Sequence, residues 1–363
     1  MPRDDAARYT GVMATERWVS PATRTPEEER QNMSLRPRRL DEYIGQPELV
    51  ERLRIVITAC RQRGEPLEHI LLHGPPGLGK TTLAHVLAEE MGAGVSITSG
   101  PALTRASDLV GALTRLKPRD ILFIDEIHRL PASVEEFIYP AMEEHRIDVT
   151  VDSGMHARTI SLSLQPFTLI GATTRAGLLS APLRSRFGLT HHLRYYAPDE
   201  LLLILERSAR LLGIAAGEAP LRSIAQRSRG TPRIANRLLR RVRDYAQVRS
   251  GGRVDMRAVD EALALEGVDE LGLDELDRSY LRTIGHTYRG GPVGLEAVAA
   301  TMNEDAGTLE DVVEPFLLQI GFLARTRRGR ALTHAAADHL KIELPHAVDV
   351  RDDAPEPGPA LFS

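Results

Sequence analysis

Gly74-Pro75-Pro76-Gly77-Leu78-Gly79-Lys80-Thr81-Thr82 follows the short apolar run 70–73 and precedes a segment, 82–90, whose apolar residues recur at helical spacing. Gly77 and Gly79 let the backbone curl so that successive N–H groups point at an anion, and the helix directs its positive end at the same place. Lys80 offers a cation to the β- and γ-phosphates, and Thr81 offers a hydroxyl to Mg²⁺. A Gly/Pro-rich surface turn is the alternative interpretation. The complete pattern with both flanks favours a phosphate-binding loop that holds a nucleoside triphosphate through residues 77 and 79–82.

Composition sets limits on the rest of the chain. It has 363 residues, 42% of them hydrophobic and 26% charged, which is typical of a globular protein with two or three domains. The net charge of −4 predicts that any contact with nucleic acid comes from a local basic patch. The one cysteine, Cys60, cannot form an internal disulfide and is expected to be buried. With no apolar run long enough to cross a membrane, the composition predicts a soluble cytoplasmic protein.

The order of apolar segments predicts three folded units between two tails. Short apolar runs alternate with helical patterns up to residue 197, which is the rhythm of an α/β unit with a parallel sheet and helices on both faces. Helical periodicity alone continues to about residue 271, and helices followed by a short hairpin occupy the remainder. We therefore expect a large domain at 34–197, a small all-helical domain at 198–271 and a third domain at 272–345. The segments 1–33 and 346–363 are expected to be disordered.

Acidic residues follow the strand predicted at 121–124. Asp125 and Glu126 are costly at the end of a buried strand unless a cation meets them. Mg²⁺ bound to Asp125 would supply that cation, and Glu126 could polarise an attacking water. A pair of exposed strand-end acids is the alternative, which the phosphate loop 45 residues upstream disfavours. We predict that both carboxylates belong to the phosphate site.

Three further residues are candidates for the phosphate site because of their positions relative to the predicted strands and helices. Thr174 ends the next predicted strand and could hold the lytic water or sense the γ-phosphate. Arg186, like Arg184 before it, could stabilise charge on the transferred phosphoryl group from a neighbouring subunit, although spacing alone leaves a surface salt bridge equally open. Arg233 follows a predicted N-cap, Thr231, and a first-turn proline, so it would project from a helix start toward the γ-phosphate.

These motifs, taken in order, resemble the AAA+ ATPases. Within that superfamily the segments 125–130, 171–175, 230–246 and 290–295 are similar to the RuvB family of bacterial Holliday-junction branch-migration motors, and the resemblance covers about residues 34–345. It implies an AAA+ α/β domain, a helical lid domain and a winged-helix domain. It also implies ATP and Mg²⁺ as cofactors, a hexameric ring, and action on Holliday junctions in recombination and DNA repair.

The resemblance also implies roles for individual residues. Lys80 and Thr81 would hold phosphates and Mg²⁺, Asp125 and Glu126 would form the acidic pair, Thr174 would be the first sensor and Arg233 the second. Arg186 would act in trans on the nucleotide of the next subunit. The adenine positions of the family fall here on Leu35, Arg36, Tyr43, Ile44 and Tyr196.

A hairpin insertion is a further feature of the family, where it docks on the junction-binding partner RuvA. Alternating apolar and polar residues around 147–162 fit a two-stranded ribbon of this kind. Its tip, residues 151–156, departs from the usual apolar and Gly-Pro pattern of the family. The resemblance therefore implies a RuvA-type partner without fixing the contacts, and it adds a RuvC-type junction resolvase as another partner.

The third unit is typical of a winged helix-turn-helix, with helices at 295–302 and from Thr308, the latter expected to begin with a Thr308–Asp311 capping box and to kink at Pro315. A sequence-reading helix would carry basic or amide side chains, yet this one carries Glu310, Asp311 and Glu314. The wing instead has four arginines within residues 325–330. We expect the wing to bind the DNA backbone without base specificity, and by resemblance Arg325 and Arg330 make the contacts.

Other functional classes remain to be weighed against a DNA motor. A DExH helicase is suggested by residues 125–128, but it needs two nucleotide-binding cores and one phosphate loop is present. An ATP-gated transcription regulator would need a basic recognition helix. A clamp-loader-like AAA+ switch shares the ATPase core and the trans-acting arginine, but would lack the arginine-rich wing and the hairpin.

Overall fold

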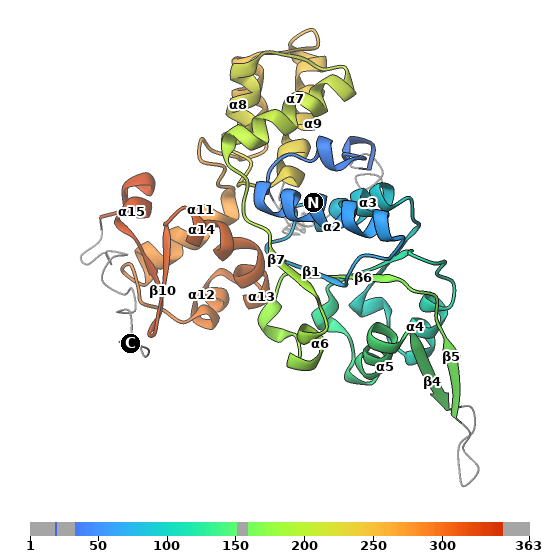
Figure 1. The fold of residues 1–363 in the computed structure, drawn as a ribbon. Coiled ribbons are helices and arrows are strands. Elements are labelled where there is room, and N and C mark those ends of the chain that lie inside the picture. The colour runs from blue at the N-terminus through green and yellow to red at the C-terminus, as the bar shows by residue number, and fades with distance from the viewer. Residues whose placement is uncertain (1–18, 20–32, 151–158, 344–363) are drawn as a thin grey trace, which may run out of the picture.

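The computed structural model describes residue 19, residues 33–150 and residues 159–343, and the chain forms three units that meet around the phosphate loop (Figure 1). Most of the two predicted tails and the tip of the predicted hairpin at 151–156 lie outside the described residues. The sheet unit comes first, the helical unit of α7–α10 lies above it in Figure 1, and the C-terminal unit of α11–α15 lies to its left.

The sheet unit is built on five parallel strands in the order β2-β3-β6-β1-β7. Strand β1 lies between β6 and β7, and its residues alternate between two cores: Ile70 and Leu72 face one, and Leu71 faces the other. Such burial on both faces explains why these strands appear in the sequence as short continuous apolar runs. The strands are β1 (Ile70–His73), β2 (Val95–Ser99), β3 (Ile121–Asp125), β6 (Thr168–Thr173) and β7 (Leu189–His192).

Helices cover both faces of this sheet, which confirms the predicted α/β class. Apolar residues of α2 and α3 belong to one core, and those of α4 and α5 belong to the other. The helices are α2 (Pro47–Arg63), α3 (Lys80–Met91), α4 (Ala106–Leu113), α5 (Ala132–Glu144) and α6 (Ala181–Ser185), with short 3₁₀ turns at Leu40–Glu42, Gly100–Ala102, Ile127–Arg129 and Ala176–Leu178. Cys60, on α2, is buried as expected.

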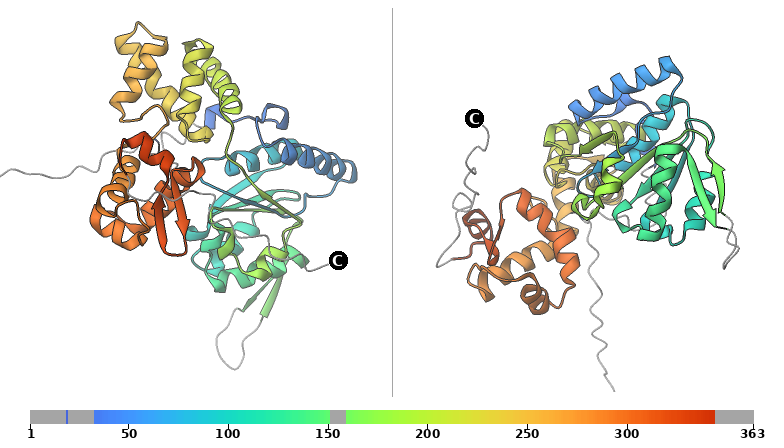
Figure 2. Two further views of the ribbon diagram at one scale, coloured as in Figure 1. Left: turned by 90° about the vertical axis from the view of Figure 1, so that its left-hand side faces the viewer. Right: turned by 60° about the horizontal axis from the view of Figure 1, so that its bottom comes forward.

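A hairpin extends from the sheet unit. Strands β4 (Arg146–Thr150) and β5 (Thr159–Ser163) pair antiparallel, with Ile147 opposite Leu162. The ribbon predicted around 147–162 is therefore present in the described part of the segment. Figures 1 and 2 show it projecting from the end of the unit that lies away from both the helical unit and the C-terminal unit.

The helical unit consists of α7 (Pro198–Leu212), α8 (Glu218–Gln226), α9 (Pro232–Arg249) and α10 (Met256–Leu265). It differs from the all-helical expectation in one respect, because β8 (Ala215–Ala216) and β9 (Arg253–Val254) form a short parallel pair. These strands are only two residues long, too short for a periodic signal in the sequence, and the pairing depends on a contact between distant segments. Thr231 is the N-cap of α9 and Pro232 occupies its first turn, as predicted.

The C-terminal unit is a winged helix with a separate core centred on Tyr280, Leu309 and Leu317. Its wing strands pair antiparallel, with Arg325 opposite Arg330. The elements are α11 (Glu275–Arg282), α12 (Leu295–Met302), α13 (Ala306–Thr308), α14 (Glu314–Gln319), β10 (Leu323–Thr326), β11 (Gly329–Leu332) and α15 (His334–Leu340), with π-helical turns at Thr283–Thr287 and Leu309–Val313.

The second helix of this unit begins differently from the prediction. The Thr308–Asp311 capping box is wrong: Asp305 is the N-cap, and its carboxylate accepts a hydrogen bond of 2.7 Å from the Thr308 backbone N–H. The helix begins at Asp305 because a carboxylate at the N-cap position accepts hydrogen bonds from backbone N–H groups that have no partner within the helix. The expected break near Pro315 is present, since a π-helical turn precedes α14 and Pro315 lies in the first turn of α14.

A buried ion pair joins the helical and C-terminal units. Arg229, which follows α8, donates to the carboxylate of Asp277 on α11 and, at 2.8 Å, to the carbonyl of Gly272. Its guanidinium also lies 4.8 Å from the centroid of the Phe316 ring. Because a buried charge is costly without its partner, these contacts hold the two units in a defined orientation.

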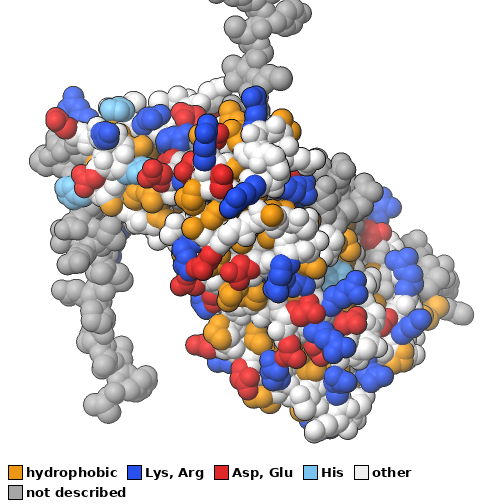
Figure 3. Space-filling model, turned by 90° about the horizontal axis from the view of Figure 1, so that it is seen from above, with side chains coloured by type: hydrophobic (Ala, Val, Ile, Leu, Met, Phe, Trp, Pro, Cys, Tyr) orange, Lys and Arg blue, Asp and Glu red, His pale blue; other side chains and the backbone are white. Residues whose placement is uncertain are grey.

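No helix in the described part of the chain is long and apolar enough to cross a membrane. On the face seen in Figure 3, Lys and Arg side chains are interspersed with Asp and Glu, in keeping with the small net charge.

Candidate active site

The phosphate loop connects β1 to α3 at the carboxyl edge of the sheet. Gly74 has a φ of +137°, and a Cβ there would lie 2.6 Å from the Leu193 carbonyl oxygen, so only glycine fits. Gly79, the N-cap of α3, has a φ of +95°. The sequence pattern is therefore required by the path of the backbone, which leaves the first N–H groups of α3 directed at the loop interior.

Lys80 is buried inside this loop. Its Nζ donates hydrogen bonds of 2.8 Å to the carbonyls of Gly74 and Pro75. Burial lowers the pKa of the Lys80 ammonium to about 8, and the nearby Asp125 carboxylate opposes that change. A desolvated ammonium with two neutral acceptors is poised to exchange them for the charged oxygens of a phosphate.

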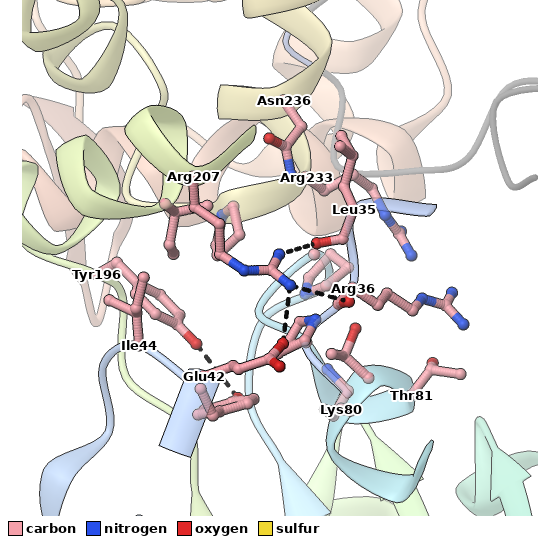
Figure 4. A pocket seen from close by; sticks show the side chains of 18 of the residues that line it. Leu35, Arg36, Glu42, Ile44, Lys80, Thr81, Tyr196, Arg207, Arg233 and Asn236 are labelled. Carbon is pink, nitrogen blue, oxygen red and sulfur yellow. Dashed lines mark hydrogen bonds and ion pairs between the residues drawn. The ribbon is translucent and has the colours of Figure 1, made fainter. Parts of the chain in front are cut away.

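A cavity of about 320 Å³ opens from this loop toward the helical unit. It brings together all eleven predicted nucleotide-binding positions and five of the six predicted catalytic ones, with Lys80 and Arg233 in both sets: Leu35, Arg36, Tyr43, Ile44, Gly77, Gly79, Lys80, Thr81, Thr82, Tyr196, Asp125, Glu126, Thr174 and Arg233. The strand ends explain the convergence, because β1, β3 and β6 are adjacent and parallel and so release their following residues at one edge. Figure 4 shows Lys80 and Thr81 at one end of the cavity and Tyr196 and Ile44 toward the other.

The acidic pair lies at the end of β3. The Glu126 backbone N–H donates a 2.9 Å hydrogen bond to Asp125 Oδ1, and Glu126 itself has a φ of 49°. Thr81 and Asp125 line the same cavity and offer hydroxyl and carboxylate oxygens, the donors that Mg²⁺ prefers. These two residues therefore have the donor chemistry that would hold a magnesium ion.

Two tyrosines close the far end of the cavity. The Tyr196 hydroxyl lies 3.2 Å from that of Tyr43 and 3.4 Å from the Leu78 carbonyl oxygen. Burial raises the pKa of Tyr43 to about 12 and that of Tyr196 well above 10, so both hydroxyls remain protonated. Apolar rings with a few polar atoms are the usual lining of a site for a purine base.

Arg207 is a lining residue that the sequence did not reveal. From α7 it donates hydrogen bonds to the carbonyls of Leu35 at 2.6 Å and Arg36 at 3.4 Å, and it forms a 2.9 Å ion pair with Glu42 (Figure 4). It therefore holds the predicted adenine segment against the helical unit. Its only sequence signal is a polar position on an amphipathic helix 127 residues after Lys80, which is too general to identify a function.

Arg186 is the one predicted catalytic residue that lies outside the cavity. Its guanidinium lies 4.3 Å from the centroid of the Tyr139 ring and forms an ion pair with Glu143 at 3.2 Å. Its Nη1 donates 2.7 Å to the Pro182 carbonyl. Arg186 therefore does not line the cavity of its own chain in this conformation, and its action on another subunit's nucleotide remains a prediction.

The wing arginines are also engaged within the chain. Arg325 and Arg330 both donate to the carboxylate of Glu314, each through Nε at 2.8 Å. Glu314 is fully buried, and it also accepts a 2.6 Å hydrogen bond from the Tyr280 hydroxyl. Burial raises the pKa of Glu314, but hydrogen bonds from these three partners outweigh it and lower the pKa overall. Glu314 is thus buried within the winged helix, where it pairs with both wing arginines.

The phosphate loop, acidic pair, helical lid and winged helix define a P-loop ATPase of the AAA+ type. Three family models match in succession: the Holliday junction DNA helicase RuvB P-loop domain at 35–193, the RuvB AAA lid domain at 196–269 and the RuvB C-terminal winged helix domain at 270–341. The chain belongs to the RuvB family.

Curated relatives and a solved structure are similar to this chain over most of its length. The "Holliday junction branch migration complex subunit RuvB" of Desulfosudis oleivorans is 58% identical over 89% of this chain and 95% of its own length. The protein of the same name from Myxococcus xanthus is 55% identical over 88% of this chain and 93% of its own. The solved structure titled "Thermotoga maritima RuvB Holliday junction branch migration motor" has a TM-score of 0.78 at 49% identity and covers 86% of this chain and 100% of that chain.

Family membership confirms the sequence-based resemblance and implies that the cavity binds nucleotide. The individual roles assigned to the lining residues remain predictions.

The anchoring role of Arg207 can be tested directly. We expect Arg207→Met to weaken binding of a fluorescent ATP analogue by about tenfold, because segment 35–44 loses charged hydrogen bonds worth about 1.5 kcal/mol. Arg222→Met is the matched control, since Arg222 forms exposed ion pairs with Asp199 and Glu218 on the same unit. Equal affinity in the two variants would contradict the assignment.

Proposed function

We propose that this protein is an ATP-driven motor that moves duplex DNA through Holliday junctions during recombination and repair. The observation that carries the proposal is the combination, in one chain, of a complete phosphate site with a winged helix bearing an arginine-rich wing. The titles of its relatives, which name a branch migration complex and a branch migration motor, support it.

ATP hydrolysis is assigned to the residues that converge on the cavity. Lys80 would bind the β- and γ-phosphates, and Glu126 would accept a proton from the attacking water. Thr174 would orient that water, and Arg233 would contact the γ-phosphate from the start of α9. Mg²⁺, held by Thr81 and Asp125, would neutralise charge on the phosphate oxygens when bound.

Arg233 also gives the nucleotide a way to change the angle between domains. It extends from the helical unit, whereas Lys80 and Glu126 belong to the sheet unit, and all three line one cavity. A γ-phosphate that contacts both units favours their closed arrangement, and its loss on hydrolysis removes that preference.

A ring is proposed because Arg186 does not line the cavity of its own chain in this structure. In a head-to-tail assembly its guanidinium would approach the nucleotide of the next subunit and stabilise charge in the transition state. Six subunits are proposed from the family resemblance.

Two partner proteins are proposed. The β4–β5 hairpin, which projects away from the other units, is proposed to dock on a RuvA-type junction-binding protein, and a RuvC-type resolvase is proposed to act on the same junctions. A motor that acts on bacterial DNA is proposed to work in the cytoplasm. The transcription-regulator and clamp-loader alternatives are not retained, because all three domain matches belong to one motor family.

Glu126 provides the test of hydrolysis. We expect Glu126→Gln to bind the ATP analogue with unchanged affinity and to lower kcat by about 10²-fold or more, because an amide cannot accept the proton. Steady-state phosphate release measures the effect, and Glu136→Gln, on the exposed surface of α5, is the control. Normal turnover by Glu126→Gln would remove Glu126 from the role of base.

A test of the wing arginines must also change Glu314. Removing Arg325 and Arg330 alone would leave a buried carboxylate without its counterions. We compare Glu314→Gln with the triple variant Glu314→Gln, Arg325→Gln, Arg330→Gln. The single variant should retain DNA-stimulated ATPase activity. The triple variant should lose the stimulation, keep basal turnover, and show a log K against log salt slope reduced by about 1 to 2. Identical slopes would exclude Arg325 and Arg330 as DNA contacts.

A further inference from the structure

A polar network behind the acidic pair is not used by the functions assigned above. His128 lies in the 3₁₀ turn after Glu126, and its side chain is only 6% exposed. Its Nδ1 lies 2.8 Å from the Thr173 hydroxyl oxygen, and its Nε2 lies 3.7 Å from the Glu126 carboxylate. Neither His128 nor Thr173 is among the described residues that line the nucleotide cavity.

The surroundings of the His128 ring favour the tautomer with its proton on Nε2. The Thr173 oxygen accepts a 3.0 Å hydrogen bond from the Arg175 backbone N–H, and its hydroxyl proton can be donated to the His128 Nδ1 lone pair. With Nδ1 as acceptor, a neutral imidazole has its proton on Nε2. The opposite tautomer would direct a lone pair at a carboxylate, which is repulsive.

Burial favours this neutral form. Desolvation lowers the pKa of His128, with Glu126 opposing that change and Arg175 and Arg129 adding to it. At neutral pH the ring is therefore an oriented dipole whose N–H end faces Glu126.

The backbone of Glu126 is fixed while its carboxylate is not. Its φ of 49° and ψ of 41° are in the left-handed region, and Gly100 packs so closely that a Cβ there would lie 2.4 Å from the Glu126 carbonyl oxygen. The side chain, by contrast, is 37% exposed at the cavity wall. A carboxylate on a rigid backbone needs a side-chain partner to select one orientation.

We propose that His128 is a positioning residue for Glu126: its Nε2–H donates to the carboxylate and holds it toward the water site, and Thr173 fixes the ring for this purpose. The 3.7 Å separation is longer than a hydrogen bond, so the proposal requires the exposed Glu126 carboxylate to move toward the ring when it acts. The inference rests on the proposed role of Glu126 as general base.

Loss of this contact should affect turnover and not binding. A base displaced by about 1 Å lowers the rate by as much as about 10²-fold, whereas the KM for ATP depends on cavity residues that the change leaves in place. A merely structural histidine would instead lower stability and affect kcat and KM together.

The experiment compares four substitutions in the full-length protein by steady-state ATPase kinetics. His128→Leu removes both hydrogen bonds and should lower kcat by about 10- to 100-fold with KM unchanged. His128→Gln, with one acceptor and one donor, should restore most of kcat. Thr173→Val should resemble His128→Leu, and Thr173→Ser should resemble the wild-type protein.

The double variant His128→Leu, Thr173→Val supplies the decisive comparison. Because the two residues act as one unit, its kcat should be no lower than that of the worse single variant. Full kcat in His128→Leu, or additive losses in the double variant, would overturn the proposal. Melting temperatures show whether each variant is folded, and Thr173→Val keeps the test available if His128→Leu does not fold.

Failure of this inference is distinguishable from failure of the proposed function. If the wild-type protein does not hydrolyse ATP, the proposed function fails. If it hydrolyses ATP, depends on Glu126, and is indifferent to His128 and Thr173, only the positioning role fails.

Discussion

The structure depends on the close packing of β1 between β6 and β7. This arrangement places Gly74 against the backbone of Leu193, with its N–H donating 3.1 Å to the Thr173 carbonyl, so the loop cannot start anywhere else. The same edge receives Asp125 from β3 and Thr174 from β6. One sheet edge thus determines where phosphate, metal and water would meet, and helices on both faces bury the strands that fix it.

The nucleotide cavity is shared between units, and this arrangement gives it mechanical significance. Arg207 and Arg233 reach it from the helical unit, while the phosphate loop belongs to the sheet unit. The winged helix is tied to the helical unit through Arg229 and Asp277, and it touches the sheet unit where Arg175, directly after Thr174, pairs with Asp311. All three units are therefore linked by contacts that lie beside the site.

Local motifs were predictable from sequence, and long-range contacts were not. The loop around Lys80, the acids after β3 and the start of α9 follow from spacing, because neighbouring residues create the required backbone. Arg207, the pairing of His128 with Thr173, and the burial of Glu314 depend on segments that are far apart in sequence. The prediction of a capping box at Thr308 was wrong because Asp305 and Thr308 are both residue types that begin helices. Only the path of the backbone shows that Asp305 is the N-cap.

The central proposal is that ATP hydrolysis at the shared cavity moves DNA. The most direct test is dissociation of a synthetic four-way junction by the full-length protein and a RuvA-type partner, with either ATP or a non-hydrolysable analogue. The account predicts dissociation with ATP and none with the analogue, although the complex assembles in both. Equal dissociation with the analogue, or none with ATP despite steady hydrolysis, would contradict it.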